Sequence, residues 1–234
     1  FPTRRSSDLL HSLPGLENCS IEKYAYAIEY DAIDPLQCKP TLENKIIENL
    51  YTAGQINGTS GYEEAAAQGL MAGINAARKL DHREPLILHR DEAYIGVMID
   101  DLVTKGTKEP YRLLTSRAEY RLLLRHDNAD ARLSEYGHEI GLLSDERYAR
   151  FQKKMQDIED MISYLSGVRF TPKSTVNALL ERLGLDVLKE GISAAELLKR
   201  PGITIALLQP YLEYACDPAI AKLAEIEIRY EGYI

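Results

Sequence analysis

The stretch from Asn49 to Leu80 constrains the fold most, because a β-compatible run, a glycine-rich loop and a run of small residues follow one another there. Leu50–Ala53 favours a short strand. Gly54, Gly58 and Gly61 then interrupt a polar loop. Glycine accepts positive φ angles and lets a ligand come close to the backbone. The order of these parts predicts strand, turn and helix.

The helix expected from Tyr62 onward is rich in alanine and glycine, so it presents a smooth face to a sheet or a flat ligand. We expect Ser60, or Thr59 before it, to cap this helix, with Glu63 completing a capping box. A helix N-terminus behind a glycine loop attracts anionic or carbonyl oxygens. A tight connection without any ligand explains the spacing about equally well, so the loop alone leaves both interpretations open.

Composition excludes several classes of protein. The 234 residues suffice for one or two domains, and no apolar run approaches the length of a membrane span. Residues 1–30 lack the pattern of a signal peptide. The net charge of −8 argues mildly against nucleic acid, but residues 105–132 carry seven lysines or arginines against four acidic residues. Any nucleic-acid contact is therefore expected in that region.

The cysteines and histidines show no metal-ligand spacing, so we expect no metal site. Cys19, Cys38 and Cys216 form an odd, sparse set, which is typical of free thiols in a reducing cytoplasm. We therefore expect a cytoplasmic protein.

The N-terminal part is expected to be the end of an α/β nucleotide-binding domain. Residues 1–9 show no periodicity and are predicted to be non-native sequence. Ile21–Asp31 favours a strand, and Thr41–Asn49 favours a strand with a turn. Such domains normally open with a G-x-G-x-x-G turn, which this sequence lacks. We thus expect residues 10–90 to be the C-terminal part of that domain, with more chain upstream.

A helical region is expected over residues 91–166. Asp91–Lys105 has helical spacing and is followed by Gly106. Leu113–Arg125 is also predicted to be helical, with Thr115 or Ser116 as N-cap. Its three arginines recur every four residues and would form one basic stripe, at Arg117, Arg121 and Arg125.

The last part of the chain is predicted to be all-helical. Ser144 is expected to cap a long helix whose apolar seam runs from Tyr148 to Leu165. Packing inside a helical bundle is the favoured interpretation of the seam, and an intermolecular coiled coil is the alternative. Several short helices separated by glycine and proline follow, so residues 167–234 are predicted to be a C-terminal helical domain, here incomplete.

Four sequence blocks carry a family resemblance. They are YAIEYD at Tyr26–Asp31, AGQINGTSGYEEAAAQG at Ala53–Gly69, the long block Ala93–Arg125, and DNADARL at Asp127–Leu133. Together they resemble the tRNA uridine 5-carboxymethylaminomethyl modification enzymes, the MnmG or GidA family, over nearly the whole chain. The folate-dependent tRNA uracil-54 methyltransferases have a similar flavin loop but lack the KEPYRLLTSRAEYRLLLR block, so they are the weaker alternative.

The resemblance implies a fold class and an activity. The fold would be mixed α/β and mostly α: the C-terminal end of an FAD-binding Rossmann-like domain at residues 10–90, a tRNA-facing helical region, and an all-helical domain. The family uses FAD, NADH and methylene-tetrahydrofolate, and works with an MnmE-type GTPase. It builds a (carboxymethyl)aminomethyl group at C5 of the tRNA wobble uridine. We further expect a homodimer, no membrane contact, and no activity from this chain alone.

The resemblance also implies residue roles. The family's pyrophosphate-binding turn and redox cysteines have no counterpart here, so no cysteine is assigned to catalysis. Tyr26 is a weak catalytic candidate, since a buried strand tyrosine is an equally good interpretation. The FAD contacts would be Gly54, Gln55, Asn57, Gly58 and Thr59. The tRNA contacts would be Lys105, Lys108, Arg112, Arg117, Arg121 and Arg125.

Two alternatives stay open. The basic residues would otherwise form a solvated face, with Glu109 and Glu119 as partners within the helix. The whole chain would otherwise be a binding module for tRNA and a protein partner, without flavin activity.

Overall fold

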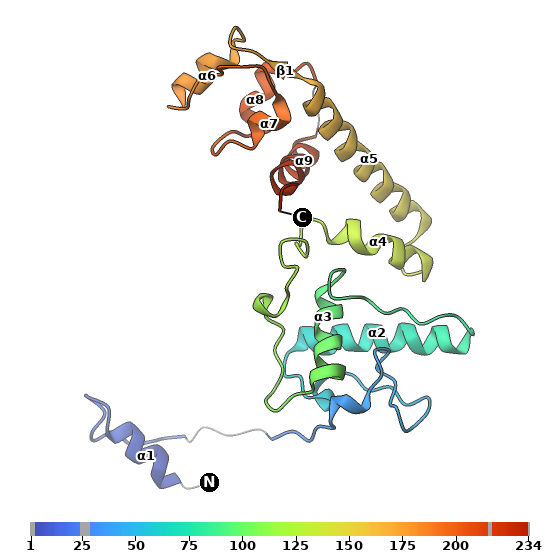
Figure 1. The fold of residues 1–234 in the computed structure, drawn as a ribbon. Coiled ribbons are helices and arrows are strands. Elements are labelled where there is room, and N and C mark those ends of the chain that lie inside the picture. Colours follow the sequence, from blue (N-terminus) through green and yellow to red (C-terminus); the bar gives the residue numbers. More distant parts are fainter. Residues whose placement is uncertain (1–2, 24–28, 215–216, 234) are drawn as a thin grey trace. The chain divides into compact units, whose positions relative to one another are not determined.

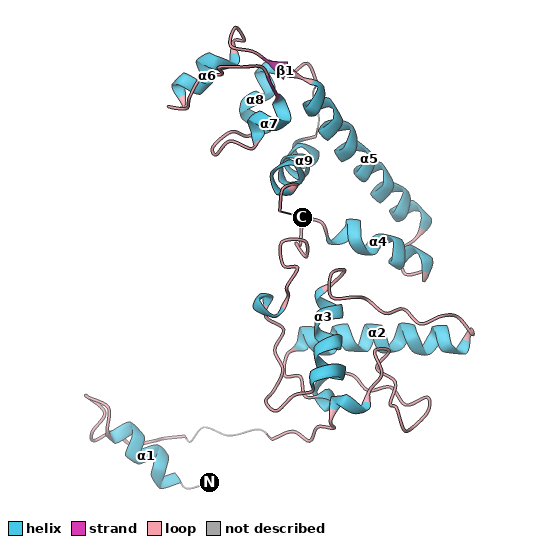
Figure 2. Cartoon of the chain, viewed as in Figure 1, coloured by secondary structure: helices cyan, strands magenta, loops and turns pink. Residues whose placement is uncertain are grey.

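The computed structural model describes residues 3–23, 29–214 and 217–233 (Figures 1 and 2). The chain divides into two compact units, residues 1–32 and residues 33–234. The fold is mixed and mostly helical, as the sequence predicts.

The first unit contains helix α1 (Thr3–His11). Residues 3–9 therefore belong to a helix although their sequence shows no periodicity, and the non-native origin of residues 1–9 stays a prediction. The predicted strand Ile21–Asp31 includes residues 24–28, which lie outside the described residues. Its described ends, residues 21–23 and 29–31, are not in a strand.

The second unit begins with loops and short turns that pack around one long helix. The turns are η1 (Pro35–Gln37) and η2 (Gly54–Asn57), and the long helix is α2 (Tyr62–Leu80). The strands predicted at residues 41–49 and 50–53 are wrong. Residues 38–59 instead make isolated bridges between Cys38 and Asn44, between Glu43 and Tyr51, and between Thr59 and Tyr111. A strand persists only beside a second strand, and the described residues offer none here.

The helix predicted at residues 91–105 is confirmed with a later start. Helix α3 (Tyr94–Asp100) runs into a π-helical turn, η3 (Asp101–Lys105), and Gly106 ends it at φ +66°. The start is delayed because the N–H groups of Glu92 and Ala93 both bond to the carbonyl of His89 in a turn. Buried α2 and α3 side chains, including Met71 and Met98, form the core of this part together with Leu42, Leu102 and Tyr111.

The predicted helix Leu113–Arg125 is wrong. The segment holds only the short turn η4 (Thr115–Arg117), followed by further turns up to helix α4 (Ala129–Glu139). Arg117, Arg121 and Arg125 therefore do not share a helical face.

The C-terminal part is a helical bundle built on α5 (Asp145–Gly167), with α7 (Ala194–Leu198) and α9 (Pro218–Tyr230) packed against it. Ser144 caps α5 by accepting the N–H of Arg147, as predicted. The other helices are α6 (Val176–Arg182), α8 (Ile205–Leu208) and the turn η5 (Gln209–Tyr211).

The apolar seam of α5 packs inside this bundle, which confirms the favoured interpretation. Met161 and Leu165 are fully buried in the same core cluster as Leu180 and Leu198. The prediction of an all-helical module misses one small sheet, in which β1 (Arg169–Phe170) pairs antiparallel with β2 (Ile192–Ser193).

Candidate functional site

The glycine-rich loop before α2 needs glycine at two positions for physical reasons. Gly54 and Gly58 have φ angles of +86° and +81°. A Cβ atom at Gly54 would lie 3.1 Å from that of Ala65, and one at Gly58 would lie 2.6 Å from the Thr107 hydroxyl oxygen. Side chains at either position would be strained and crowded. The predicted need for glycine in this loop is confirmed at both positions.

Gln68, on the second turn of α2, forms side-chain hydrogen bonds to three residues of the loop. Its fully buried carbonyl oxygen accepts the N–H of Gly54 at 3.0 Å and the side-chain amide of Asn57 at 2.9 Å. Its amide nitrogen donates to the hydroxyl of Thr59 at 3.1 Å. Sequence analysis missed Gln68, although a long polar residue on a helix of small residues was a usable signal.

This network divides the predicted cofactor residues into two groups. Gly54, Asn57 and Thr59 are buried, and they shape the loop from inside. Gln55 and Gly58 are half-buried, so of the five predicted cofactor residues they are the two that a ligand can reach. The side-chain Oδ1 of Asn57 is buried and has no hydrogen-bond partner among the described residues. Such an unsatisfied group calls for an explanation, and a ligand or water beside the loop would provide one.

The N-terminus of α2 carries no side-chain cap. Gly61 is the N-cap residue, so the predicted capping box of Ser60 and Glu63 is wrong. Ser60 is unable to cap because its backbone pairs with Tyr111, whose carbonyl accepts the Ser60 N–H at 3.4 Å. The N-cap residue therefore offers no side-chain acceptor, and the carboxylate of Glu64 accepts the N–H of its own residue in this first turn.

The loop is hydrogen-bonded directly to the segment with the basic residues. The carbonyl of Gly58 accepts the N–H of Tyr111 at 2.8 Å, in the bridge between Thr59 and Tyr111. Glu64, in the first turn of α2, accepts the N–H of Leu113 at 2.8 Å and the Nε of Arg112 at 3.3 Å. Two parts of the sequence that were predicted to have different roles are therefore hydrogen-bonded to each other in the fold.

Three of the six predicted basic residues lie near this junction. Arg112 is exposed, and the guanidinium of Arg117 lies 4.4 Å from the centre of the Tyr111 ring. The Nε of Arg117 also donates to the carbonyl of Arg112. Lys105 is exposed, with its ammonium 2.6 Å from a carboxylate oxygen of Asp101.

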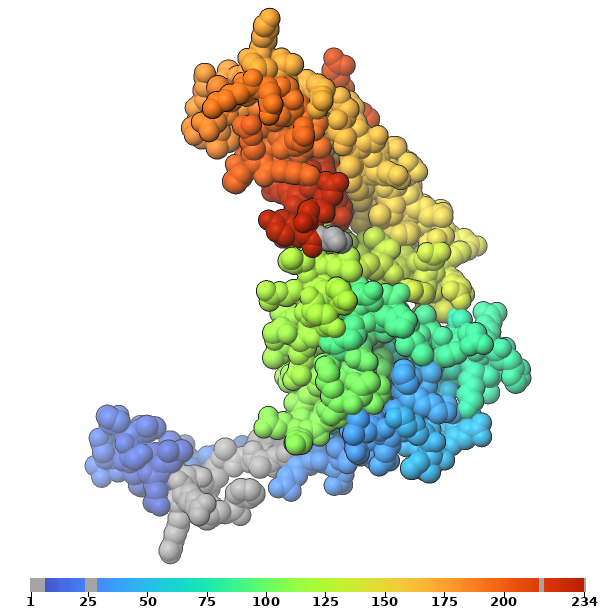
Figure 3. Space-filling view, in the orientation of Figure 1, coloured from blue at the N-terminus to red at the C-terminus, as the bar shows by residue number. Residues whose placement is uncertain are grey.

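The other three basic residues differ sharply in exposure. Lys108 and Arg121 are exposed. The Arg125 side chain is only 10% exposed and forms ion pairs with Asp127 and Glu227, which joins the segment to α9. Figure 3 shows the red C-terminal helix against the green segment at this place.

Arg90 explains why the segment is irregular. Its guanidinium forms ion pairs with Asp100, Asp101 and Glu119 and also donates to the carbonyl of Arg117. The Arg90 hydrogen bond lowers the pKa of Glu119 to about 2. Glu119 thus pairs across the fold with Arg90, and not with arginines of its own helix as the alternative interpretation expected.

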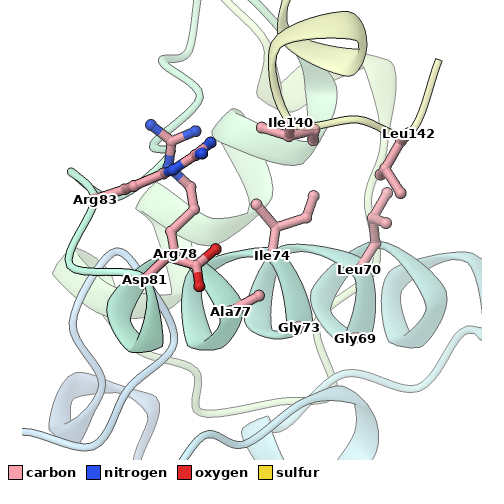
Figure 4. Close-up of a pocket in the computed structure, with 10 residues that line it drawn as sticks. All are labelled: Gly69, Leu70, Gly73, Ile74, Ala77, Arg78, Asp81, Arg83, Ile140 and Leu142. Carbon is pink, nitrogen blue, oxygen red and sulfur yellow. The ribbon is translucent and has the colours of Figure 1, made fainter. Parts of the chain in front are cut away.

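A groove of about 370 Å³ lies along the later turns of α2 (Figure 4). The small residues Gly69, Gly73 and Ala77 form its floor, and Ile140 and Leu142 face Ile74 and Leu70 across it. The smooth helix face that the sequence predicts is therefore open over these turns.

The described residues contain neither a cluster of metal ligands nor a membrane-spanning helix. Over residues 3–23, 29–214 and 217–233, no three His, Cys, Asp or Glu side chains come together as metal ligands do. No helix in the same ranges combines the length and apolar character needed to cross a bilayer. Tyr26 lies outside the described residues, so the structure does not place this candidate.

Comparison with known proteins gives the family. The family described as "Glucose inhibited division protein A" matches residues 1–84. The family described as "tRNA modifying enzyme MnmG/GidA C-terminal helical domain" matches residues 145–234. The chain belongs to the MnmG/GidA family. This assignment favours MnmG/GidA over the methyltransferase alternative.

Curated MnmG/GidA relatives match the chain along its whole length. The tRNA uridine 5-carboxymethylaminomethyl modification enzyme MnmG of Listeria innocua is 60% identical, and that of Enterococcus faecalis is 58% identical. Each match covers 100% of this chain and 38% of the relative. The chain thus spans well under half the length of these relatives.

Solved structures agree with the family assignment. Aquifex aeolicus GidA in its form II crystal superposes with a TM-score of 0.81 at 43% identity. That match covers 99% of this chain and 36% of the solved one. The form I crystal gives a TM-score of 0.79 at 42% identity.

Proposed function

We propose that this chain is the part of a tRNA-modifying flavoprotein that carries one wall of the flavin site and an RNA-facing surface. The protein would install a (carboxymethyl)aminomethyl group at C5 of the wobble uridine. The relatives are named for this modification. The observation that carries the proposal is the direct hydrogen bonding between the glycine loop and the basic segment at Tyr111.

The loop fits the edge of a flavin. Gln55 and Gly58 would lie against the cofactor, close to the N-terminus of α2, whose partial positive charge favours oxygen atoms. Gly54, Asn57 and Thr59 would keep the loop in shape through Gln68. When bound, FAD supplies the electron-transfer chemistry, and N–H donors at its edge favour the negative charge of a reduced ring.

The exposed basic residues would bind tRNA phosphates. Arginine suits this role because its planar fork donates two hydrogen bonds to one phosphate. The proposed set is Lys105, Lys108, Arg112, Arg117 and Arg121. Arg125 differs, because its guanidinium already pairs with two carboxylates, so we propose that it holds the segment against α9.

The remaining family properties are proposals that rest on the resemblance. They are NADH and methylene-tetrahydrofolate as co-substrates, an MnmE-type GTPase as partner, a homodimer, and a cytoplasmic location. A tRNA and partner-binding module without flavin activity is the second candidate function. It is favoured only by the short span of the chain relative to its relatives.

A segment exchange tests the proposed function. The matching segment of the Listeria innocua enzyme would be replaced by this chain, in a strain that lacks its own enzyme. Mass spectrometry of tRNA nucleosides should then detect the modified wobble uridine at the level given by the unaltered Listeria innocua enzyme. Full tRNA binding without any modified nucleoside would favour the binding module instead.

A further inference from the structure

Glu64 is a buried carboxylate that the proposed roles do not yet use. It is 2% exposed and lies in the first turn of α2, beside the half-buried Gly61 and the exposed Glu63. One of its carboxylate oxygens has no hydrogen-bond partner among the described residues. Burying a charged group costs free energy unless it is paired and hydrogen-bonded, so the partners of the Glu64 carboxylate explain how it stays buried.

The contacts of Glu64 reach across the fold to the basic segment. Its Oε1 accepts the backbone N–H of Leu113 at 2.8 Å and the Nε of Arg112 at 3.3 Å. Burial raises the pKa of Glu64, but the N–H groups of Leu113 and of Glu64 itself, together with the Arg112 charge, lower it by more, so it lies below the usual value. Glu64 therefore faces Arg112 as a carboxylate.

The contact leaves Arg112 arranged for a second partner. Glu64 takes only the Nε, and the Arg112 side chain is 59% exposed. Among the described residues, no acceptor bonds the two terminal nitrogens of Arg112, and these nitrogens form the fork that binds a phosphate.

Neighbouring contacts keep this arrangement rigid. The backbone of Tyr111 is bonded to the loop at Gly58 and Ser60, and the Tyr111 hydroxyl donates to Asp101. Arg117 donates to the carbonyl of Arg112 from the other side. Glu64 is thus the side-chain contact that sets the direction of Arg112 within a backbone fixed by other bonds.

We propose that Glu64 is a positioning residue, which holds Arg112 so that its two terminal nitrogens meet a phosphate of bound tRNA. This inference rests on the proposed function, since it takes Arg112 as an RNA contact. The expected effect is opposite to that of charge repulsion alone, because removing a carboxylate near RNA would otherwise strengthen binding. If Glu64 positions Arg112, removing the Glu64 carboxylate weakens tRNA binding.

The test is tRNA binding by the 234-residue chain at several salt concentrations, with melting curves to verify folding. Arg112→Ala should weaken binding on the order of tenfold, as expected for a charged hydrogen bond. Glu64→Gln should weaken binding several-fold, and should add nothing in the Arg112→Ala background. Arg112→Lys keeps the positive charge but loses the Nε donor that Glu64 accepts. This variant should also weaken tRNA binding, even though Glu64 itself is unaltered.

The matched control is Glu63→Gln, which removes an exposed carboxylate next along the same helix and should leave affinity unchanged or slightly raised. If Glu64→Gln binds tRNA as tightly as the wild type while Arg112→Ala binds it weakly, the positioning role of Glu64 is overturned and the RNA contact of Arg112 remains. Arg112→Lys with wild-type affinity would also overturn it, even if Glu64→Gln does not fold. Wild-type binding by Arg112→Ala would instead remove Arg112 from the proposed RNA surface and the inference with it.

Discussion

Glu43 shows how a single buried carboxylate can give the fold a measurable pH dependence. It is 5% exposed and accepts hydrogen bonds from Lys79, Lys39 and the N–H of Asn49. The lysine hydrogen bonds, with Lys79 foremost, lower the pKa of Glu43 from 4.5 to about 2. Its stabilising effect is therefore complete above about pH 4.5 and is lost as the pH falls towards 2.

Melting curves of wild type and Glu43→Gln between pH 2 and pH 7 test this dependence. The wild type should melt at a higher temperature above pH 5, and the gap should close towards pH 2, where Glu43 becomes protonated in both states. A gap that stays constant over this range would show that the effect of Glu43 is not its charge. The exposed Glu63→Gln variant is the control.

Arg121 and Arg125 form a second test at the residue scale, because they occur in one segment but differ in surroundings. Arg121→Ala should reduce the salt slope of tRNA binding by about 1 and leave the melting temperature nearly unchanged. Arg125→Ala should lower the melting temperature by several degrees, since it leaves Asp127 and Glu227 without their cation. If the two variants exchange these effects, the proposed division of roles is wrong.

At the scale of elements, local sequence signals predict the long helices and fail for the segment between them. Helix α5 has both a serine cap and an apolar seam, and α2 follows a glycine loop, so each is signalled by residues close together in the chain. The arginine spacing of residues 113–125 is a weak signal by comparison. Contacts with Arg90 and Glu64, which are distant in sequence, set the backbone there.

The same limit applies to the candidate site. The glycine positions were predictable because positive φ depends on the residue itself. The roles of Gln68, Glu64 and Arg90 were not, because each depends on partners that only the folded chain brings near. The expected capping box failed for a related reason: Ser60 is already paired with Tyr111.

At the scale of the molecule, the loop and the basic segment belong to one compact unit, residues 33–234, that also contains the C-terminal helices. Arg125 and Glu227 join the segment to α9, so the proposed RNA-facing surface is tied to the C-terminal helical domain of the family. The match covers 38% of the Listeria innocua relative, so a test of cofactor binding uses that relative with this chain in place of its matching segment.

The flavin content of that chimaera with Gly58→Val is the most direct test of the account. Valine at φ +81° would be strained and would crowd Thr107. We expect the unaltered chimaera to purify with about one flavin per chain, as a single cofactor site implies. Gly58→Val should lose most of that flavin absorbance, while Gly167→Val, at the end of α5 with open space around it, should keep it. Equal flavin content in Gly58→Val and the unaltered chimaera would contradict the assignment of the loop to the cofactor site.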